Sequence, residues 1–187
     1  MSRSLSSFDS THNFVFSYYY ALPLDKGLTM LPRRLTQGWS LGGITRFATG
    51  FPVGLSQSGD RSLIGSSGTD VPSFVGPLVT QDPRLPGPNR PNEFFAKTGF
   101  VSGPLGGFGN ANRKFFHGPG FNNWNLALHK DTRILESLAL QFRAEFFNAF
   151  NHAQFNNPNG NFNSSRFGYV TSARDPRIGQ VSLKLLF

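Results

Sequence analysis

The chain has 187 residues, enough for one domain, but Phe and Gly each occur 21 times and Pro 13 times. Cys is absent, which excludes disulfides, thiolate metal sites and cysteine nucleophiles. The net charge of +8 comes from basic residues scattered along the chain rather than from a basic stripe with stacking aromatics, so nucleic acid is not an expected partner. An all-β fold is expected, because chains rich in aromatic residues, Gly and Asn favour strands and turns over helices.

The first two segments with strand-like alternation are residues 12–22 and 39–56. A strand places alternate side chains on opposite faces. In residues 12–22 one face carries Phe14, Phe16, Tyr18, Tyr20 and Leu22. In residues 39–56 the apolar positions include Trp39, Leu41 and Phe47, whereas Ser40, Gly42 and Arg46 lie opposite, and Pro52 would interrupt the ladder of hydrogen bonds.

Three further segments follow at residues 121–131, 138–151 and 178–187. The middle one contains good helix formers, but only a strand places Gln141, Arg143 and Glu145 on one face, so a strand is favoured over a helix. In the last segment Val181, Leu183, Leu185 and the terminal Phe187 alternate with Gln180, Ser182 and Lys184.

The connections between these segments alternate in length. Residues 57–120 and 152–177 are long and rich in Gly, Pro, Ser and Asn, whereas 132–137 is short and 23–38 is intermediate. A compact soluble domain rarely contains a loop as long as residues 57–120. Outer-membrane barrels have short periplasmic turns and long extracellular loops, so we expect an antiparallel meander of about five to six strands, a fragment of a transmembrane β-barrel.

The beginning of the chain bears on export. No run approaches the roughly 20 apolar residues of a membrane helix. Residues 1–13 are polar and lack the apolar core of a signal peptide. Because a barrel protein must be exported, we expect the chain to be a fragment or a truncated reading frame.

Four stretches resemble a known family. GWSLGGITRFATGFP (38–52), FGNANRKFFHGPGFNNWNLALHKD (108–131), LQFRAEFFNAFNHAQFNNPN (140–159) and SARDPRIGQVSLKLLF (172–187) are similar to the C-terminal barrel region of Oar-like TonB-dependent receptors. The resemblance implies that residues 1–187 form the C-terminal part of a barrel of about 22 strands, filled in complete members by a plug. It implies uptake of a ligand across the bacterial outer membrane.

Partners and residue roles follow from this interpretation. The expected partners are outer-membrane lipid and lipopolysaccharide, the missing plug and N-terminal strands of the same receptor, the barrel-assembly machinery and, through the missing N-terminal region, TonB. Membrane-interface aromatics are expected at Tyr18, Tyr20, Trp39, Trp124 and Phe187, and lumen-facing polar side chains at Arg46, His129, Arg143, Glu145 and Lys184. A C-terminal assembly signal is expected at Val181, Leu183, Leu185 and Phe187.

Two alternatives stand beside the barrel. The same apolar faces could pack the core of a soluble, secreted β-sandwich that binds a carbohydrate or acts as an adhesin. An enzyme is not expected, because GxSxG, HExxH and Walker motifs are absent and the four His lack metal-ligand spacing. No catalytic, metal or cofactor site is therefore predicted.

Overall fold

A computed structural model describes residues 3–66, 68, 70–85 and 92–187. The chain divides into two compact units, each assembled from three stretches of sequence. The sheet unit comprises residues 13–47, 122–153 and 175–187, and the loop unit comprises residues 1–12, 48–121 and 154–174.

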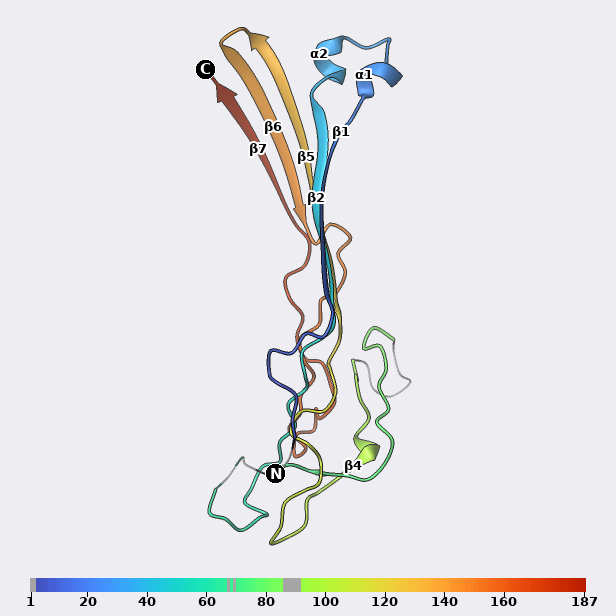
Figure 1. Ribbon diagram of the computed structural model, residues 1–187, viewed down its shortest axis with the longest axis vertical. Helices are drawn as coiled ribbons and strands as arrows, with labels where there is room; N and C mark the ends of the chain where they lie inside the picture. The colour runs from blue at the N-terminus through green and yellow to red at the C-terminus, as the bar shows by residue number, and fades with distance from the viewer. Residues whose placement is uncertain (1–2, 67, 69, 86–91) are drawn as a thin grey trace. The chain divides into compact units, whose positions relative to one another are not determined.

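The long strands form one antiparallel sheet, which confirms the predicted all-β class. The strands β1 (Asn13–Ala21), β2 (Trp39–Ala48), β5 (Phe121–Leu135), β6 (Leu138–Phe147) and β7 (Ile178–Leu186) lie in the order β1-β2-β5-β6-β7 and alternate in direction (Figure 1). Their lengths of 9, 10, 15, 10 and 9 residues meet or exceed the roughly 9–11 residues that a strand needs to cross a bilayer.

The register separates apolar from polar side chains. Phe142 lies opposite Lys130 and Leu183, and the next residue, Arg143, lies opposite His129 and Ser182. Successive side chains of a strand point to opposite faces. The resulting apolar face comprises, on these three strands, Trp124, Leu126, Leu128, Lys130, Leu140, Phe142, Ala144, Phe146, Val181, Leu183 and Leu185. The polar face comprises Asn125, His129, Asp131, Gln141, Arg143, Glu145, Gln180, Ser182 and Lys184, together with Asn123 from the same alternation.

Aromatic contacts extend the apolar face across the other two strands. The Phe47 ring lies 5.8 Å from the Trp124 ring, and Phe14 lies 6.5 Å from Phe47, both measured between centroids. Within the described residues no second layer covers this face, since Val181 and Leu183 are 68% and 66% exposed. The sheet therefore presents a broad apolar surface instead of burying it.

Two strands end earlier than the alternation predicted. The second strand ends at Ala48 rather than near residue 56, because the chain beyond it pairs within the loop unit instead of along the sheet. Beyond it, Val53 and Leu55 donate to the carbonyls of Phe116 and Arg113, at 2.9 and 2.7 Å, within the loop unit. The strand β6 ends at Phe147, before Asn148 and Asn151 take positive φ angles of 50° and 53°.

Three features lie at one end of the sheet (Figure 1). These are the C-terminus, the two-residue turn between β5 and β6, and the β1–β2 connection with the short helices α1 (Leu24–Gly27) and α2 (Arg33–Thr36). Gly38, just before β2, has a φ of +76° and accepts a hydrogen bond of 2.9 Å from the Asp131 N–H. Among the residues that the structure describes, no helix is long and apolar enough to cross a membrane.

The loop unit has a phenylalanine core that the sequence patterns did not predict. Phe95 is fully buried and lies 5.7, 5.2 and 5.0 Å from the ring centroids of Phe100, Phe116 and Phe167, all near edge-to-face. The cluster also contains Val53, Leu55 and Ala111. Short strands β3 (Ser73–Phe74) and β4 (Phe100–Val101), the latter preceded by the 3₁₀ turn η1 (Lys97–Gly99), pair beside it. Segments distant in sequence are thus tied together by aromatic packing rather than by a long ladder.

Buried polar groups also hold the loop unit together. The Gln57 side chain donates to the Ser102 hydroxyl at 2.6 Å and accepts from the Gly103 N–H at 2.9 Å. The Asp70 carboxylate accepts from the N–H groups of Arg61 and Ser62, at 2.7 and 3.1 Å. Hydrogen bonding from the Ser62 side chain and backbone lowers the pKa of Asp70, with a smaller contribution from Arg61, against the opposing effect of burial.

Candidate functional site

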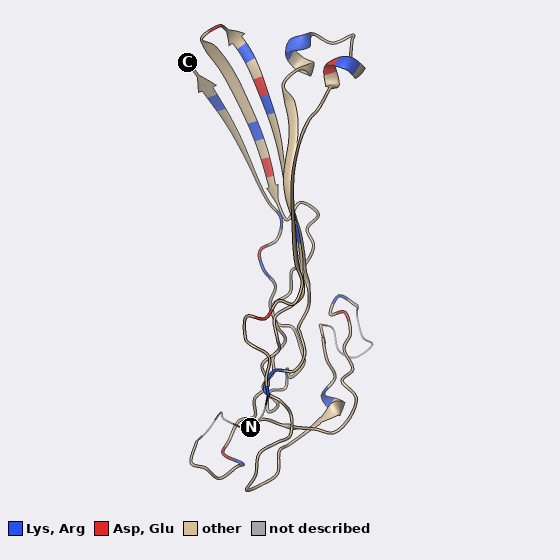
Figure 2. Cartoon of the chain, in the orientation of Figure 1, with Lys and Arg blue, Asp and Glu red and all other residues tan. Residues whose placement is uncertain are grey.

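Polar side chains of β5, β6 and β7 form a connected network on the polar face. Glu145 forms an ion pair with Arg143 two residues earlier on β6 and accepts a hydrogen bond from the Gln180 amide on β7. Gln141 donates to Asp131 on β5 at 2.9 Å. Figure 2 shows charged residues on each of the three strands. Cross-strand pairs of this kind stabilise a sheet and fix its register.

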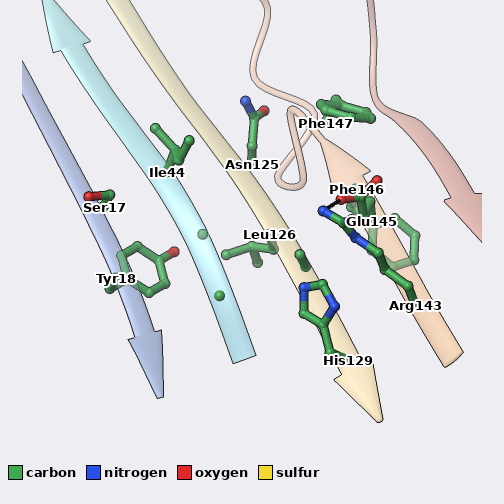
Figure 3. Close-up of a pocket in the computed structure, with 13 residues that line it drawn as sticks. Ser17, Tyr18, Ile44, Asn125, Leu126, His129, Arg143, Glu145, Phe146 and Phe147 are labelled. Atoms are coloured by element: carbon green, nitrogen blue, oxygen red, sulfur yellow. Dashed lines mark ion pairs between the residues drawn. The ribbon is translucent and has the colours of Figure 1, made fainter. Parts of the chain in front are cut away.

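A shallow hollow of about 360 Å³ lies within the sheet unit, bordered by residues of β1, β2, β5 and β6 (Figure 3). Gly42, Gly43 and Ala127 leave space because they lack large side chains. Arg143 reaches toward Glu145 at one side of the hollow, and His129 lies on the neighbouring strand (Figure 3). The hollow therefore offers a cation, an anion and an imidazole to whatever lies against it.

The structure places the five residues predicted to face a lumen on one side of the sheet. His129, Arg143, Glu145 and Lys184 share the polar face through their register. Arg46 precedes Phe47, which lies on the apolar face, and its Nε donates to the Asn13 side chain at 3.0 Å. Three of the five border the hollow, whereas Arg46 and Lys184 do not.

The predicted interface aromatics divide between the two ends of the apolar face. At the helical end Trp39 lies 6.5 Å from Phe142, and Tyr20 lies on the adjacent strand, where the Leu22 N–H donates to the Trp39 carbonyl. At the opposite end Trp124 lies between Phe47 and Phe150, at 5.8 and 5.5 Å.

The spacing of the two aromatic groups can be estimated along β2. Trp39 and Phe47 are eight residues apart on this strand, which corresponds to about 26 Å at ~3.3 Å per residue. The apolar band of an outer-membrane barrel is about 25 Å tall and has aromatic residues at both borders.

Tyr18 and Phe187 differ from the other predicted aromatics. The Tyr18 ring covers Gly43 at mid-strand, where an added Cβ would lie 2.6 Å from the ring. Mid-strand packing rather than an end position is thus its observed environment. Phe187 follows the end of β7 and is 99% exposed.

The predicted assembly signal lies on β7, at the border of the sheet. Val181, Leu183 and Leu185 project from its apolar face, opposite Ala144, Phe142 and Leu140 of β6. Among the described strands β7 pairs with β6 alone, and β1 pairs with β2 alone. Both outer strands therefore carry a row of backbone groups available for a further strand.

Sequence reasoning missed Lys130. Its position on the apolar face is unusual for a charged residue, and its ammonium donates to the carbonyls of Arg34, Leu35 and Gln37 at 3.1, 3.1 and 2.9 Å. The available signal was a lysine at an apolar position of the alternation, two residues after Leu128. Within the described parts of the chain, no three His, Asp or Glu side chains gather as metal ligands would.

An open, one-layer antiparallel sheet with one apolar and one polar face, built from strands long enough to cross a bilayer, defines part of a transmembrane β-barrel wall. The model of the outer membrane beta barrel domain family matches residues 1–180. The chain belongs to this family and is a protein of the outer membrane. Searches among curated proteins and among solved structures gave no significant match.

Proposed function

We propose that this chain supplies closing strands and extracellular loops to the barrel of a TonB-dependent receptor that takes up a ligand across the outer membrane. The observation that carries the proposal is the two-faced sheet whose outer strands, β1 and β7, each pair on one side only. Lipid does not tolerate unpaired strand edges, and the smallest barrels need about eight strands. Further strands must therefore complete the wall, and a receptor barrel of about 22 strands would supply them.

The connections support an orientation for the sheet. All three stretches of the loop unit are joined to one end of the strands: before β1, between β2 and β5, and between β6 and β7. The other end carries the two-residue β5–β6 turn and the β1–β2 connection. Since outer-membrane barrels have short periplasmic turns, we place the loop unit outside the cell and the helices α1 and α2 in the periplasm.

The roles of the two faces follow from this arrangement. The apolar face would contact lipid, with Trp39, Tyr20 and Phe187 at the periplasmic border and Trp124 at the extracellular border. The polar face would line the lumen, where Arg143, Glu145 and His129 offer charge to the plug of the same receptor. These residues bind no cofactor and perform no chemistry in this proposal.

The remaining partners are assigned on the same basis. The exposed row of Val181, Leu183 and Leu185 on β7 suits recognition by the barrel-assembly machinery through strand addition. Lipopolysaccharide would contact the extracellular border, and TonB would bind the receptor only through its N-terminal region. The resemblance of residues 38–52, 108–131, 140–159 and 172–187 to Oar-like receptors supports these assignments.

The soluble β-sandwich is the weaker candidate. A sandwich needs a second sheet against its apolar face. In the sheet unit, the apolar side chains of β7 are instead more than half exposed, with Val181, Leu183 and Leu185 at 68%, 66% and 51%. Membership of an outer-membrane barrel family agrees with the exposed face.

The proposal is tested on the polypeptide that carries this sequence in the outer membrane of its source cells. We expect a heat-modifiable barrel that contains a plug and crosslinks to TonB, whereas TonB lacking its C-terminal domain gives no crosslink. A polypeptide of 20.6 kDa that forms a complete barrel by itself, without plug or TonB contact, would overturn the receptor assignment.

A further inference from the structure

The β1–β2 connection is a fixed structure rather than a loose turn. Lys130 donates to three carbonyls at the C-terminal end of α2, and its ammonium lies 4.9 Å from the centroid of the Trp39 ring. The Trp39 indole N–H donates to the Leu35 carbonyl at 2.7 Å. Gln37 reaches back to the Asp25 carboxylate of α1 at 3.3 Å. The two short helices are therefore fastened to each other and to the sheet.

The attachment is made from the apolar face. Lys130 lies opposite Phe142 in the register, and the Trp39 ring lies 6.5 Å from that of Phe142. A charged residue on an apolar face is accounted for here, because helix carbonyls accept hydrogen bonds from its ammonium group and an aromatic ring makes a cation–π contact with it. The β1–β2 connection is thus continuous with the surface that meets lipid.

This connection exposes apolar side chains of its own. Leu28, Met30, Leu31 and Leu35 are 47%, 99%, 48% and 58% exposed. Such side chains beside the end of a lipid-facing sheet can insert at the border of the hydrocarbon layer.

Two arginines lie between Leu31 and Leu35 in the sequence. Arg33 and Arg34 of α2 border a hollow of about 240 Å³ together with Asp131 and Arg133, which belong to the polar row of β5. Asp131 already accepts a hydrogen bond from Gln141. Within the described part of the chain, the three guanidinium groups have no ion-pair or hydrogen-bond partner. Figure 2 shows the basic residues of α2 at this end of the sheet unit.

We propose that Arg33 and Arg34, at the border of this hollow, bind the phosphate of a membrane phospholipid while Leu28, Met30, Leu31 and Leu35 insert beside its acyl chains. Arginine guanidinium groups match phosphate oxygens with paired donors, and exposed apolar side chains account for a lipid rather than a free anion. Under the proposed orientation this lipid belongs to the periplasmic leaflet. The phosphate site itself does not depend on that orientation.

Lipid retention by the full chain in dodecyl maltoside micelles tests the site. Native mass spectrometry would count bound dioleoylphosphatidylglycerol and, as the phosphate-free probe, dioleoylglycerol. We expect retention of the phospholipid only, reduced about tenfold in R33Q/R34Q, since each lost charge-assisted contact weakens phosphate binding. The control R3Q/R166Q removes the same number of positive charges from the loop unit. It should leave phospholipid retention within about twofold of that of the unaltered chain.

Three results would contradict the proposal. If R3Q/R166Q lost as much phospholipid as R33Q/R34Q, the change in net charge alone would explain the effect. If dioleoylglycerol were retained as well as dioleoylphosphatidylglycerol, the phosphate would not be what the site recognises. Displacement of the phospholipid by inorganic phosphate at millimolar concentration would identify a free anion as the ligand.

One further variant and one independent measurement separate the possible explanations. R33K/R34K keeps the charge and should recover part of the retention, which a misfolded helix would not do. An inverted orientation of the sheet would contradict the proposed receptor topology and leave phospholipid retention intact, so the two proposals fail separately.

Discussion

The ammonium group of Lys130 lies 4.9 Å from the centre of the Trp39 ring, and both side chains donate a hydrogen bond to the Leu35 carbonyl. One residue belongs to β5 and the other to β2. The pair joins two strands and a helix at a point where the chain must leave the sheet.

Replacement of Lys130 by Met should release α2. The change removes hydrogen bonds to three carbonyls and a cation–π contact, and we expect a loss of roughly 2 kcal/mol in the free energy of unfolding. Urea unfolding in detergent, followed by Trp39 fluorescence in a W124F background, measures it. Lys26→Met, an exposed change in α1, is the matched control, and an equal effect there would refute the role of the Lys130 contacts.

Replacement of Gly43 by Ala should create a collision with Tyr18. An added Cβ would lie 2.6 Å from the Tyr18 ring and 2.7 Å from the Asn125 carbonyl, so we expect a destabilisation of about 1–3 kcal/mol. Part of that loss should disappear when Tyr18 is also changed to Ala, in a double-mutant cycle of thermal unfolding. Gly27→Ala meets no atom within 4 Å and should be nearly neutral; additivity of the Gly43 and Tyr18 changes would contradict the collision.

Single cysteines can report the orientation of the sheet, because the chain has none of its own. We expect a membrane-impermeant maleimide to label L105C in intact cells, since Leu105 is 71% exposed in the loop unit. E136C, in the β5–β6 turn, should be labelled only after the outer membrane is opened. The opposite pattern would invert the proposed orientation.

Acid should loosen the segment around Asp70. The pKa of this carboxyl is lowered from its ordinary value of 3.8, chiefly by hydrogen bonding from Ser62. Its ionised form therefore contributes stability that is present above 3.8 and lost as the pH falls through the lower folded value. Amide exchange at Arg61 and Ser62, corrected for intrinsic rates, should rise between about pH 5 and about pH 2. Asp70→Asn should remove this pH dependence and Asp82→Asn should not; a dependence that persists in Asp70→Asn would exclude this carboxyl as its origin.

The sheet could be predicted from sequence because a barrel wall leaves one face in lipid. Phe142 and Leu140 alternate with Arg143 and Gln141 because one face of such a wall is apolar and the other polar. The same alternation could not reveal that residues 52–55 leave the sheet and pair with residues 113–117.

The loop unit and the basic hollow could not be predicted in this way. Phe95, Phe116 and Phe167 converge from segments without periodicity, and long-range aromatic packing leaves no local pattern. Arg33 and Arg34 were visible as a pair, but Arg133 joins them only through the pairing of strands distant in sequence.

The loop unit also bears on the order in which the sheet assembles. The β5–β6 hairpin closes through two residues, whereas β2 and β5 can meet only after residues 49–120 have formed a loop. The Gly118 N–H donates to the Phe51 carbonyl at 2.8 Å, just beyond the paired strands, and most of the phenylalanine cluster, including Phe95, Phe100 and Phe116, comes from the same loop. Early collapse of that cluster would shorten the effective loop and lower the entropy cost of joining β2 to β5. A mutation in the aromatic core should therefore slow folding of the membrane strands even though it changes none of them.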